Sequence, residues 1–338
     1  MKNLLKYSLL TALLLVVMYF SLNLGNFDIP ARRVFEMLLA RLTGSEMPEL
    51  NRYDDVILFS LRLPRIIMVV LVGASLGMTG AVSQGIFRNP LVSPFILGIS
   101  SGASLGAGIA IVFFSHISFA LDVFAGLGGF VAVISAFLIA RRPGVGVPRL
   151  SLILAGVIVS SFCISMVGIL KYLADADSQL PALTFWMMGS FSSADWRSLS
   201  LVLYILPVCM FLMTAFSWQL NILSLGDREA LFLGMNTEKW KLFFITLVVI
   251  SIGTGVARCG VIGWVGLVIP HLTRSVCGPN HRDVLPLSGF AGAFFLLIAD
   301  NLARALTSGE IPVGIITAII GTPVFIYFLR RKEARLWN

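Results

Sequence analysis

The ionisable residues of this chain offer few combinations that carry chemistry. His271, Cys277 and His281 are close in the sequence, but their spacing matches no zinc-binding pattern, so we interpret them as packing residues of an inner loop. The sequence contains no G-x-x-x-x-G-K-[ST] phosphate-binding loop and no Ser-His-Asp or Cys-His set with catalytic spacing. We therefore predict that the chain is not an enzyme and holds no metal or cofactor.

One acidic residue, Asp300, lies inside a long apolar stretch. An ionisable residue within a membrane segment is a functional candidate by default. Arg304 follows one helical turn later, so the two side chains can pair. We expect an internal ion pair near the outer end of a span. The alternative, an ion-coupled secondary transporter, usually needs ionisable groups near mid-membrane.

The elements that position these residues are membrane-spanning helices. Of the 338 residues, 57% are hydrophobic and only 12% are charged, whereas soluble proteins carry about 25% charged residues. The mean hydropathy is +0.92. A spanning helix needs about 20 mostly apolar residues. Ten candidate segments meet or approach this requirement: 4–24, 63–83, 92–114, 118–140, 150–170, 197–217, 241–257, 261–276, 285–303 and 311–329.

The basic residues predict the orientation of the spans. With the N-terminus inside, most Lys and Arg residues fall on the inner side, which is the positive-inside pattern. The net charge of +8 therefore needs no nucleic-acid partner. The first segment lacks a good cleavage site and is interpreted as an uncleaved span. We predict one transmembrane domain over residues 1–338, with both termini cytoplasmic.

The spans fall into two blocks. Spans two to five begin outside and spans seven to ten begin inside, which predicts an inverted internal repeat. Gly73, Gly77 and Gly80 form a stripe of small residues, as close helix packing in lipid requires. Pro94 and Pro270 interrupt the third and eighth spans, so these broken helices should lie among other helices.

The outer connection, residues 25–61, leads into the second span. Its stretch Ala31–Leu42 has the spacing of a helix on the membrane surface. Arg62 and Arg65 share a face on the predicted first turn of the span, where Pro64 is tolerated. Cations at a helix N-terminus oppose the helix dipole. Either lipid anchoring or recognition of an acidic partner must therefore explain these two arginines.

The inner connection, residues 218–240, contains one predicted short helix that Ser224 or Asp227 can cap. Leu231 and Phe232 give this helix apolar side chains that face the cytoplasm. From the pattern alone, the helix is either a docking surface for a soluble partner or a plain interfacial helix.

Three separated sequence stretches are too specific for generic spans. They read LRLPR at 61–65, RNPL at 88–91 and LGISSGA at 97–103; LAG at 154–156 and FWMMGS at 185–190; and GVIGWVGLVIPHLTR at 260–274 and GTPVF at 321–325. Together they resemble the FecCD-type permease subunits of bacterial ABC importers for ferric siderophores, haem and cobalamin. The resemblance extends from about residue 62 to residue 328.

The resemblance implies an all-α polytopic membrane protein with type II ABC importer architecture, in which two permease subunits enclose a central path. The implied partners are a second permease subunit (a homodimer, or a pseudo-dimer with a similar permease), two cytoplasmic ABC ATPases that use ATP and Mg, a periplasmic or lipid-anchored binding protein, and lipid. The implied location is the bacterial or archaeal cytoplasmic membrane. A ferric siderophore is the first candidate substrate, haem or cobalamin the next, and an oxyanion such as molybdate the minority alternative.

The resemblance also assigns site residues. The arginines that would meet acidic residues of the binding protein are Arg62, Arg65 and Arg304. The family's ATPase-docking pattern covers Asp227, Arg228, Glu229, Ala230, Leu231, Phe232, Leu233 and Gly234, of which Gly234 permits the left-handed turn that ends the helix. The junction of spans four and five would form a cytoplasmic gate at Arg149, Leu150 and Ser151.

Overall fold

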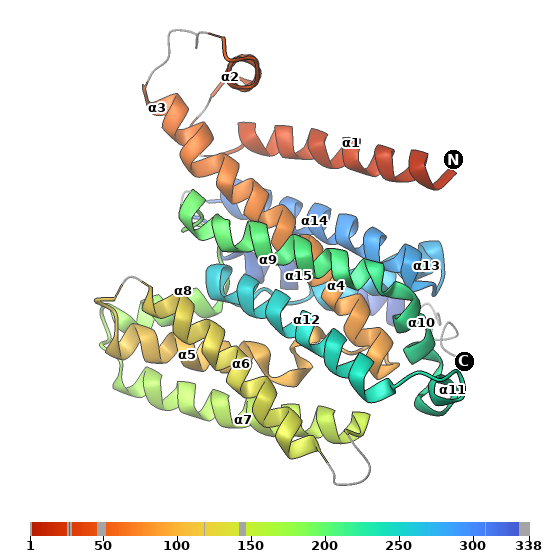
Figure 1. Ribbon diagram of the computed structural model, residues 1–338. Helices are drawn as coiled ribbons and strands as arrows, with labels where there is room; N and C mark the ends of the chain where they lie inside the picture. Colours follow the sequence, from red (N-terminus) through yellow and green to blue (C-terminus); the bar gives the residue numbers. More distant parts are fainter. Residues whose placement is uncertain are drawn as a thin grey trace.

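A computed structural model describes residues 2–25, 27, 29–45, 52–117, 119–141, 147–307 and 309–330, and all regular secondary structure within them is helical (Figure 1). In chain order the elements are α1 (Lys2–Asn23), α2 (Ala31–Thr43), α3 (Arg52–Asp55), the π-helix η1 (Val56–Arg62), α4 (Leu63–Phe87), the 3-10 helix η2 (Pro94–Leu97), α5 (Ile99–Phe113), α6 (Ala120–Ala140), α7 (Arg149–Leu173), α8 (Gln179–Met187), α9 (Trp196–Ala215), α10 (Ser217–Leu225), α11 (Asp227–Phe232), α12 (Thr237–Cys259), α13 (Val265–Cys277), α14 (His281–Ala305) and α15 (Val313–Arg330).

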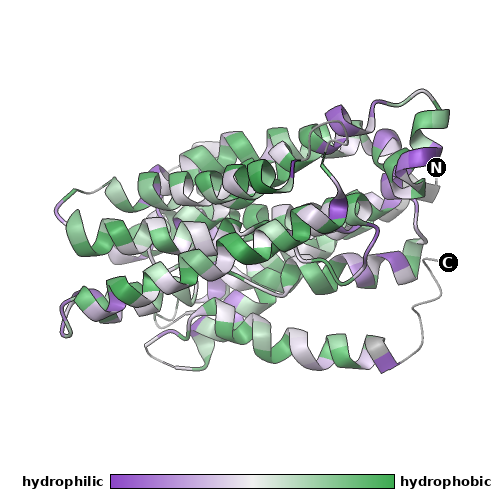
Figure 2. Ribbon diagram, turned by 90° about the horizontal axis from the view of Figure 1, so that it is seen from below, coloured by the Kyte–Doolittle hydropathy of each residue, from purple (hydrophilic) through white to green (hydrophobic). Residues whose placement is uncertain are grey.

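The predicted spans are present. Among the described residues, six helical segments are long and apolar enough to cross a membrane, and four shorter apolar helices accompany them. The longest segment joins α3, η1 and α4, and the shorter helices lie in α1, α5, α13 and α15. Figure 2 shows hydrophobic residues along most of the helix lengths and hydrophilic residues mainly near helix ends. The prediction of an all-helical polytopic membrane protein is confirmed.

The two broken spans are the short helices α5 and α13. Each follows an irregular or 3-10 segment, η2 before α5 and residues 260–264 before α13. α5 packs against α6, α7 and α12, and α13 packs against α4, α14 and α15. Both short helices therefore lie among other helices, as predicted for interrupted segments.

Helix α4 runs through the middle of the molecule and contacts α1, α9, α12, α13 and α14 (Figure 1). Its glycines lie at the closest approaches. A Cβ at Gly73 would be 2.5 Å from the Gly292 carbonyl oxygen, and one at Gly77 would be 2.1 Å from that of Ser288. A Cβ at Gly80 would be 2.0 Å from a backbone oxygen of α13. No side chain fits there, so the predicted packing role of the glycine stripe is confirmed.

The second span begins earlier than predicted. Arg62 and Pro64 are not in its first turn, because the helix continues back through η1 to Arg52. Leu63 donates its backbone N–H to the carbonyl oxygen of Leu58, five residues back, and Pro64, which has no N–H, follows directly. The change from wide π-helical turns to regular turns lets the helix continue through the proline.

In the connection 25–61, the predicted surface helix is found as α2, which ends at Gly44 with a φ of +68°. Its buried side chains are Val34, Met37 and Ala40. Residues 26, 28 and 46–51 of this connection lie outside the described residues.

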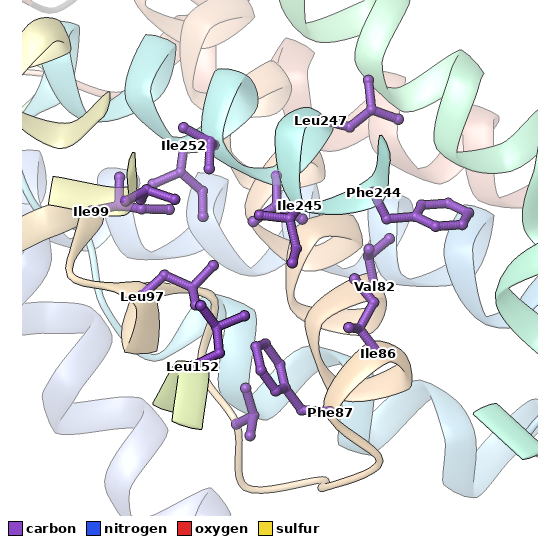
Figure 3. Packing of buried hydrophobic residues seen from close by; sticks show 14 of the residues in the cluster. Val82, Ile86, Phe87, Leu97, Ile99, Leu152, Phe244, Ile245, Leu247 and Ile252 are labelled. Carbon is purple, nitrogen blue, oxygen red and sulfur yellow. The ribbon is translucent and has the colours of Figure 1, made fainter. Parts of the chain in front are cut away.

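Among the described residues, two large hydrophobic clusters and one small one form the core, and α4 contributes to both large clusters. Figure 3 shows part of the first, in which side chains from α4, η2, α5, α7 and α12 meet. The blocks α4–α7 and α12–α15 share one order: a long helix, an irregular or 3-10 segment, a short helix and two longer helices. This shared order supports the predicted internal repeat.

Candidate functional site: charge clusters at the two ends of the bundle

Four charged side chains form a network where α4 begins, at the predicted outer end. Arg65 Nη2 and Nε donate to Asp300 Oδ1 over 2.9 and 3.1 Å, and Arg65 Nη1 donates to both carboxylate oxygens of Glu310 over 2.9 and 3.0 Å. Arg304 Nε lies 3.1 Å from Asp300 Oδ2, and Asp300 is fully buried. The predicted Asp300–Arg304 ion pair is confirmed. It belongs to a larger outer charge network of Arg65, Asp300, Arg304 and Glu310.

Two of the outer arginines also bind the end of α1. Arg62 Nη1 donates to the Leu22 carbonyl oxygen over 2.7 Å, and Arg304 Nη1 donates to that of Leu24 over 2.9 Å. The last carbonyl groups of a helix have no partner within it, and the helix dipole favours cations there. Arg62 lies within the continuous helix of η1 and α4 rather than at a helix N-terminus, and its guanidinium group stabilises the C-terminal end of α1. From the sequence alone, lipid anchoring and an acidic partner were the two predicted roles of Arg62, and the end of α1 is a third.

The three predicted docking arginines, Arg62, Arg65 and Arg304, line one outer cavity of about 220 Å³, together with Glu310. All three are buried and hold partners within the chain. The structure thus brings the three residues together as expected, but it also gives each of them a structural role.

At the opposite end of α4, the predicted inner helix is two helices, α10 and α11. Neither Ser224 nor Asp227 caps α11: Ser224 lies within α10, Asp227 is the first residue of α11, and Gly226 precedes it with a φ of +145°. Gly234 has a φ of +76° and ends the helix, as predicted. Its N–H donates to the Leu231 carbonyl oxygen, and the N–H of the next residue donates to that of Ala230, which together form a Schellman motif.

The side chains of α11 divide between solvent and core. Phe232 is 90% exposed, and its neighbours Leu231 and Leu233 are also exposed. Ala230 is fully buried in the first hydrophobic cluster. The prediction that Ala230 contacts a partner is therefore corrected, because this residue faces the chain's own interior and seats the helix. Three adjacent apolar side chains remain on the surface, where burial by a partner would be favourable.

Asp227 of α11 joins two transmembrane helices through an inner charge cluster of Arg149, Asp227 and Lys241. Arg149 Nη2 and Lys241 Nζ each donate to the Asp227 carboxylate over 2.8 Å. Burial raises the pKa of the Asp227 carboxyl group. The hydrogen bonds and positive charges of Lys241 and Arg149 outweigh burial, so the pKa lies below its usual value.

The three predicted gate residues stand at the start of α7, as expected from their place in the sequence. Arg149 points its guanidinium group to Asp227, Leu150 is 68% exposed, and Ser151 is partly buried. The residues that the sequence analysis missed are Lys241 and Glu310. Each bonds a partner assigned from a separate motif, and no local spacing signals such a contact.

The histidine and cysteine group is arranged differently from the predicted loop. His271 lies within α13 and stacks edge-on against Phe328 of α15, Cys277 ends α13, and His281 begins α14. His281 contacts the Asn221 side chain of α10 at 2.9 Å. Within the part of the chain that the structure describes, no group of three or more His, Cys, Asp or Glu side chains is arranged to hold a metal ion.

Buried polar contacts also join helices at this end of the bundle, which is the predicted inner end. Arg274 of α13 donates to the side-chain oxygen of Gln84 and, over 3.1 Å, to the carbonyl oxygen of Ala81, both on α4. Ser224 of α10 reaches the Gly85 carbonyl oxygen over 3.4 Å. The C-terminal end of α4 is therefore hydrogen-bonded to both α10 and α13.

The comparison with protein families decides which class of membrane protein this is. The sequence matches the FecCD transport family over residues 13–331, nearly the whole chain. The chain belongs to the FecCD transport family. It is therefore a permease subunit of a metal-chelate-type ABC importer, a multi-pass membrane protein without catalytic chemistry of its own.

Relatives of this FecCD permease differ in their named substrates. The molybdate import system permease MolB of Haemophilus influenzae is 38% identical over 95% of both chains. The hemin permease HmuU of Yersinia pestis is 41% identical over 82% of this chain and 84% of the relative. A permease of Helicobacter pylori named for iron chelatin transport is 38% identical over 82% of this chain and 84% of the relative.

A solved structure confirms the architecture. A transporter described as metal-chelate type, in an inward-facing conformation, superimposes with a TM-score of 0.84 at 36% identity, covering 95% of this chain and 97% of that one. The type II ABC importer fold predicted from the sequence is therefore confirmed.

Proposed function

We propose that this FecCD permease forms a homodimer that imports a ferric siderophore, driven by two cytoplasmic ATPases and supplied by a binding protein on the outer side. Both termini would lie in the cytoplasm, in the cytoplasmic membrane of a bacterium or archaeon. The observation that carries the proposal is α11: a short, rigidly ended helix that exposes three adjacent apolar side chains beside an ion-paired aspartate.

The ATPase would bind at Leu231, Phe232 and Leu233. An exposed aromatic side chain next to aliphatic ones is a common anchor at protein interfaces, because burying it in a partner's pocket removes a large apolar area from water. Asp227, Arg228 and Glu229 would provide the polar rim. A plain interfacial helix would leave unexplained why α11 is fixed to α12 and α7 through Asp227.

The binding protein would dock on the outer cavity lined by Arg62, Arg65 and Arg304. Arginine suits this contact because its planar guanidinium group binds a carboxylate through two parallel hydrogen bonds. Arg65 already binds Glu310, which is about 30% exposed. A glutamate or aspartate of the binding protein would therefore compete with Glu310 for Arg65.

Molybdate is the second candidate substrate, favoured by the 38% identity to the molybdate permease over nearly the full length of both chains. Haem and cobalamin are the remaining candidate substrates. A ferric siderophore is the first candidate because the relative named for iron chelatin supports an iron complex as the transported substrate.

Transport assays would test the proposal. The permease, its ATPase and its binding protein are placed in proteoliposomes with ATP inside. Uptake of four probes is then compared: a radio-iron-loaded hydroxamate siderophore, haem, cobalamin and molybdate. We expect uptake of the siderophore that needs ATP and survives an uncoupler. Uptake that an uncoupler abolishes would contradict the ATP-driven mechanism. Uptake of molybdate alone would contradict the siderophore proposal and identify molybdate as the substrate.

A further inference from the structure

One side chain of the docking helix reaches the inner end of α7. Asp227 accepts a hydrogen bond from Arg149, the first residue of α7, while its other side-chain contact is to Lys241 of α12. Arg149 Nη2 also lies 3.5 Å from the Leu223 carbonyl oxygen of α10. The contact therefore links α7 with the segment α10–α11 and with α12.

The inner end of α7 makes little packing contact with α11. α7 packs mainly on α5, α6 and η2. A cavity of about 320 Å³ lies between this end of α7, α11 and α12, and its wall includes Arg149, Leu152, Asp227, Leu231 and Lys241. In Figure 3 the neighbouring apolar wall is visible, with Leu152 of α7 near Phe87 of α4. The Arg149–Asp227 ion pair bridges this gap.

The docking helix itself is held firmly. Ala230 is fully buried in the core, and the Schellman motif at Gly234 fixes the end of α11. A displacement of α11 would therefore move Asp227 with it. Because Asp227 belongs to α11 and bonds Arg149 at the edge of the cavity, such a displacement would reach α7 through the ion pair.

We propose that Asp227 is a positioning residue that transmits movement of the ATPase-docking helix to the inner end of α7 by holding Arg149. The inference rests on the proposed function of α11 as the docking helix. An aspartate suits this role because its carboxylate spreads one negative charge over two oxygens, which accept hydrogen bonds from Arg149 and Lys241 at the same time. An asparagine at this position offers only one acceptor oxygen and no charge.

A cysteine reporter at the start of α7 tests the link. Leu150→Cys places a thiol at a position where the native side chain is 68% exposed, in a Cys277→Ser background, because the other cysteines, Cys163, Cys209 and Cys259, are buried. Complexes are isolated through a tag on the ATPase, so every measured permease has its partner bound. The rate of modification by a water-soluble maleimide is compared without nucleotide and after trapping with ATP and vanadate.

In the reporter background we expect the two rates to differ at least about fivefold. Asp227→Asn and Arg149→Gln should each reduce this difference to less than about twofold, and the double variant should lose no more than either single one, because both break the same contact. Asp227→Glu keeps both oxygens and should retain most of the difference. A purely structural role would lower the yield of complex without removing the nucleotide response.

Two matched variants control for charge. Arg141→Gln at the exposed end of α6 and Asp283→Asn at the start of α14 make the same changes elsewhere at the inner side, and both should keep the full response. A normal response in Arg149→Gln, which lies outside the docking helix, would overturn the inference while leaving ATPase docking intact. Failure of the parent permease to retain any ATPase would instead contradict the proposed function itself.

Discussion

The outer charge network and the inner charge cluster both join helices that are distant in the sequence, but they differ in burial. In the outer network Asp300 is fully buried and holds two arginines that are themselves buried. In the inner cluster the Asp227 side chain is 44% exposed and borders a cavity. A buried charge that loses its partner is very costly, whereas a half-exposed one can exchange its partner for water. Loss of a partner should therefore cost much more stability in the outer network than in the inner cluster.

The largest effect that this comparison predicts is for Asp300→Asn. The change removes the negative charge between Arg65 and Arg304 and leaves two buried cations together, so we expect a loss of about 3–5 kcal/mol of stability. Thermal unfolding of the purified protein and its yield in membranes would show it. Asp227→Asn makes the same substitution in the inner charge cluster, where we expect a smaller loss. An equal loss of stability would contradict the proposed difference between the outer network and the inner cluster.

Gly234→Val should affect coupling more than folding. The residue would have to adopt a φ of +76°, which costs a β-branched side chain of order 1–3 kcal/mol locally. The end of α11 should then fray, so that ATP hydrolysis no longer drives uptake although the permease remains inserted. Measured uptake per ATP hydrolysed should fall at least about tenfold, and Gly234→Asn, which tolerates positive φ, should retain more.

Glu310→Gln should have a smaller effect at the outer end, lowering stability and raising affinity for the binding protein. Arg65 loses its partly exposed partner, for a cost of about 1 kcal/mol, but keeps Asp300. If Arg65 serves in docking, affinity for the binding protein should rise, because Glu310 no longer competes for it. Titration of the binding protein against membranes would measure this. Unchanged affinity would count against Arg65 as a docking residue.

The smallest expected effect is that of pH on the inner cluster. Because the pKa of Asp227 lies below its usual value, its contribution is present above the unfolded pKa of about 3.9 and is lost only as pH falls through the lower folded value. Arg149, Lys241 and Glu238 face the same cavity. The nucleotide response of the cysteine at position 150 should therefore be unchanged from pH 8 to pH 5. A loss within that range would show that burial dominates at Asp227.

Local patterns in the sequence were sufficient for much of this fold. Hydropathy predicted the ten spans, and the i, i+4 spacing predicted the Asp300–Arg304 pair. Glycine spacing predicted a close helix contact of α4 but not its partners, which are α14 and α13. The Arg65–Asp300 contact joins residues 235 positions apart, and no local rule signals it. The π-helical start of the second span also escaped prediction, because Pro64 normally indicates a first turn.

The candidate site was predicted as a segment but not in its side-chain detail. Gly234 could be assigned from its own backbone preference. The orientation of Ala230 could not, because the buried face of a six-residue helix depends on where α10 and α12 lie. The contact between Arg149 and Asp227 likewise depends on the tertiary position of α7, although both residues were predicted to be functional.

The central claim is that α11 binds the ATPase through its exposed apolar side chains. The most direct test is to measure the affinity of the Phe232→Asp variant for the ATPase. Tyr172→Asp is the matched control, since Tyr172 is also 90% exposed but lies near the opposite end of α7 from Arg149. We predict that Phe232→Asp lowers ATPase affinity at least about tenfold without loss of thermal stability, and that Tyr172→Asp leaves it unchanged. Normal ATPase binding by a folded Phe232→Asp variant would contradict the account.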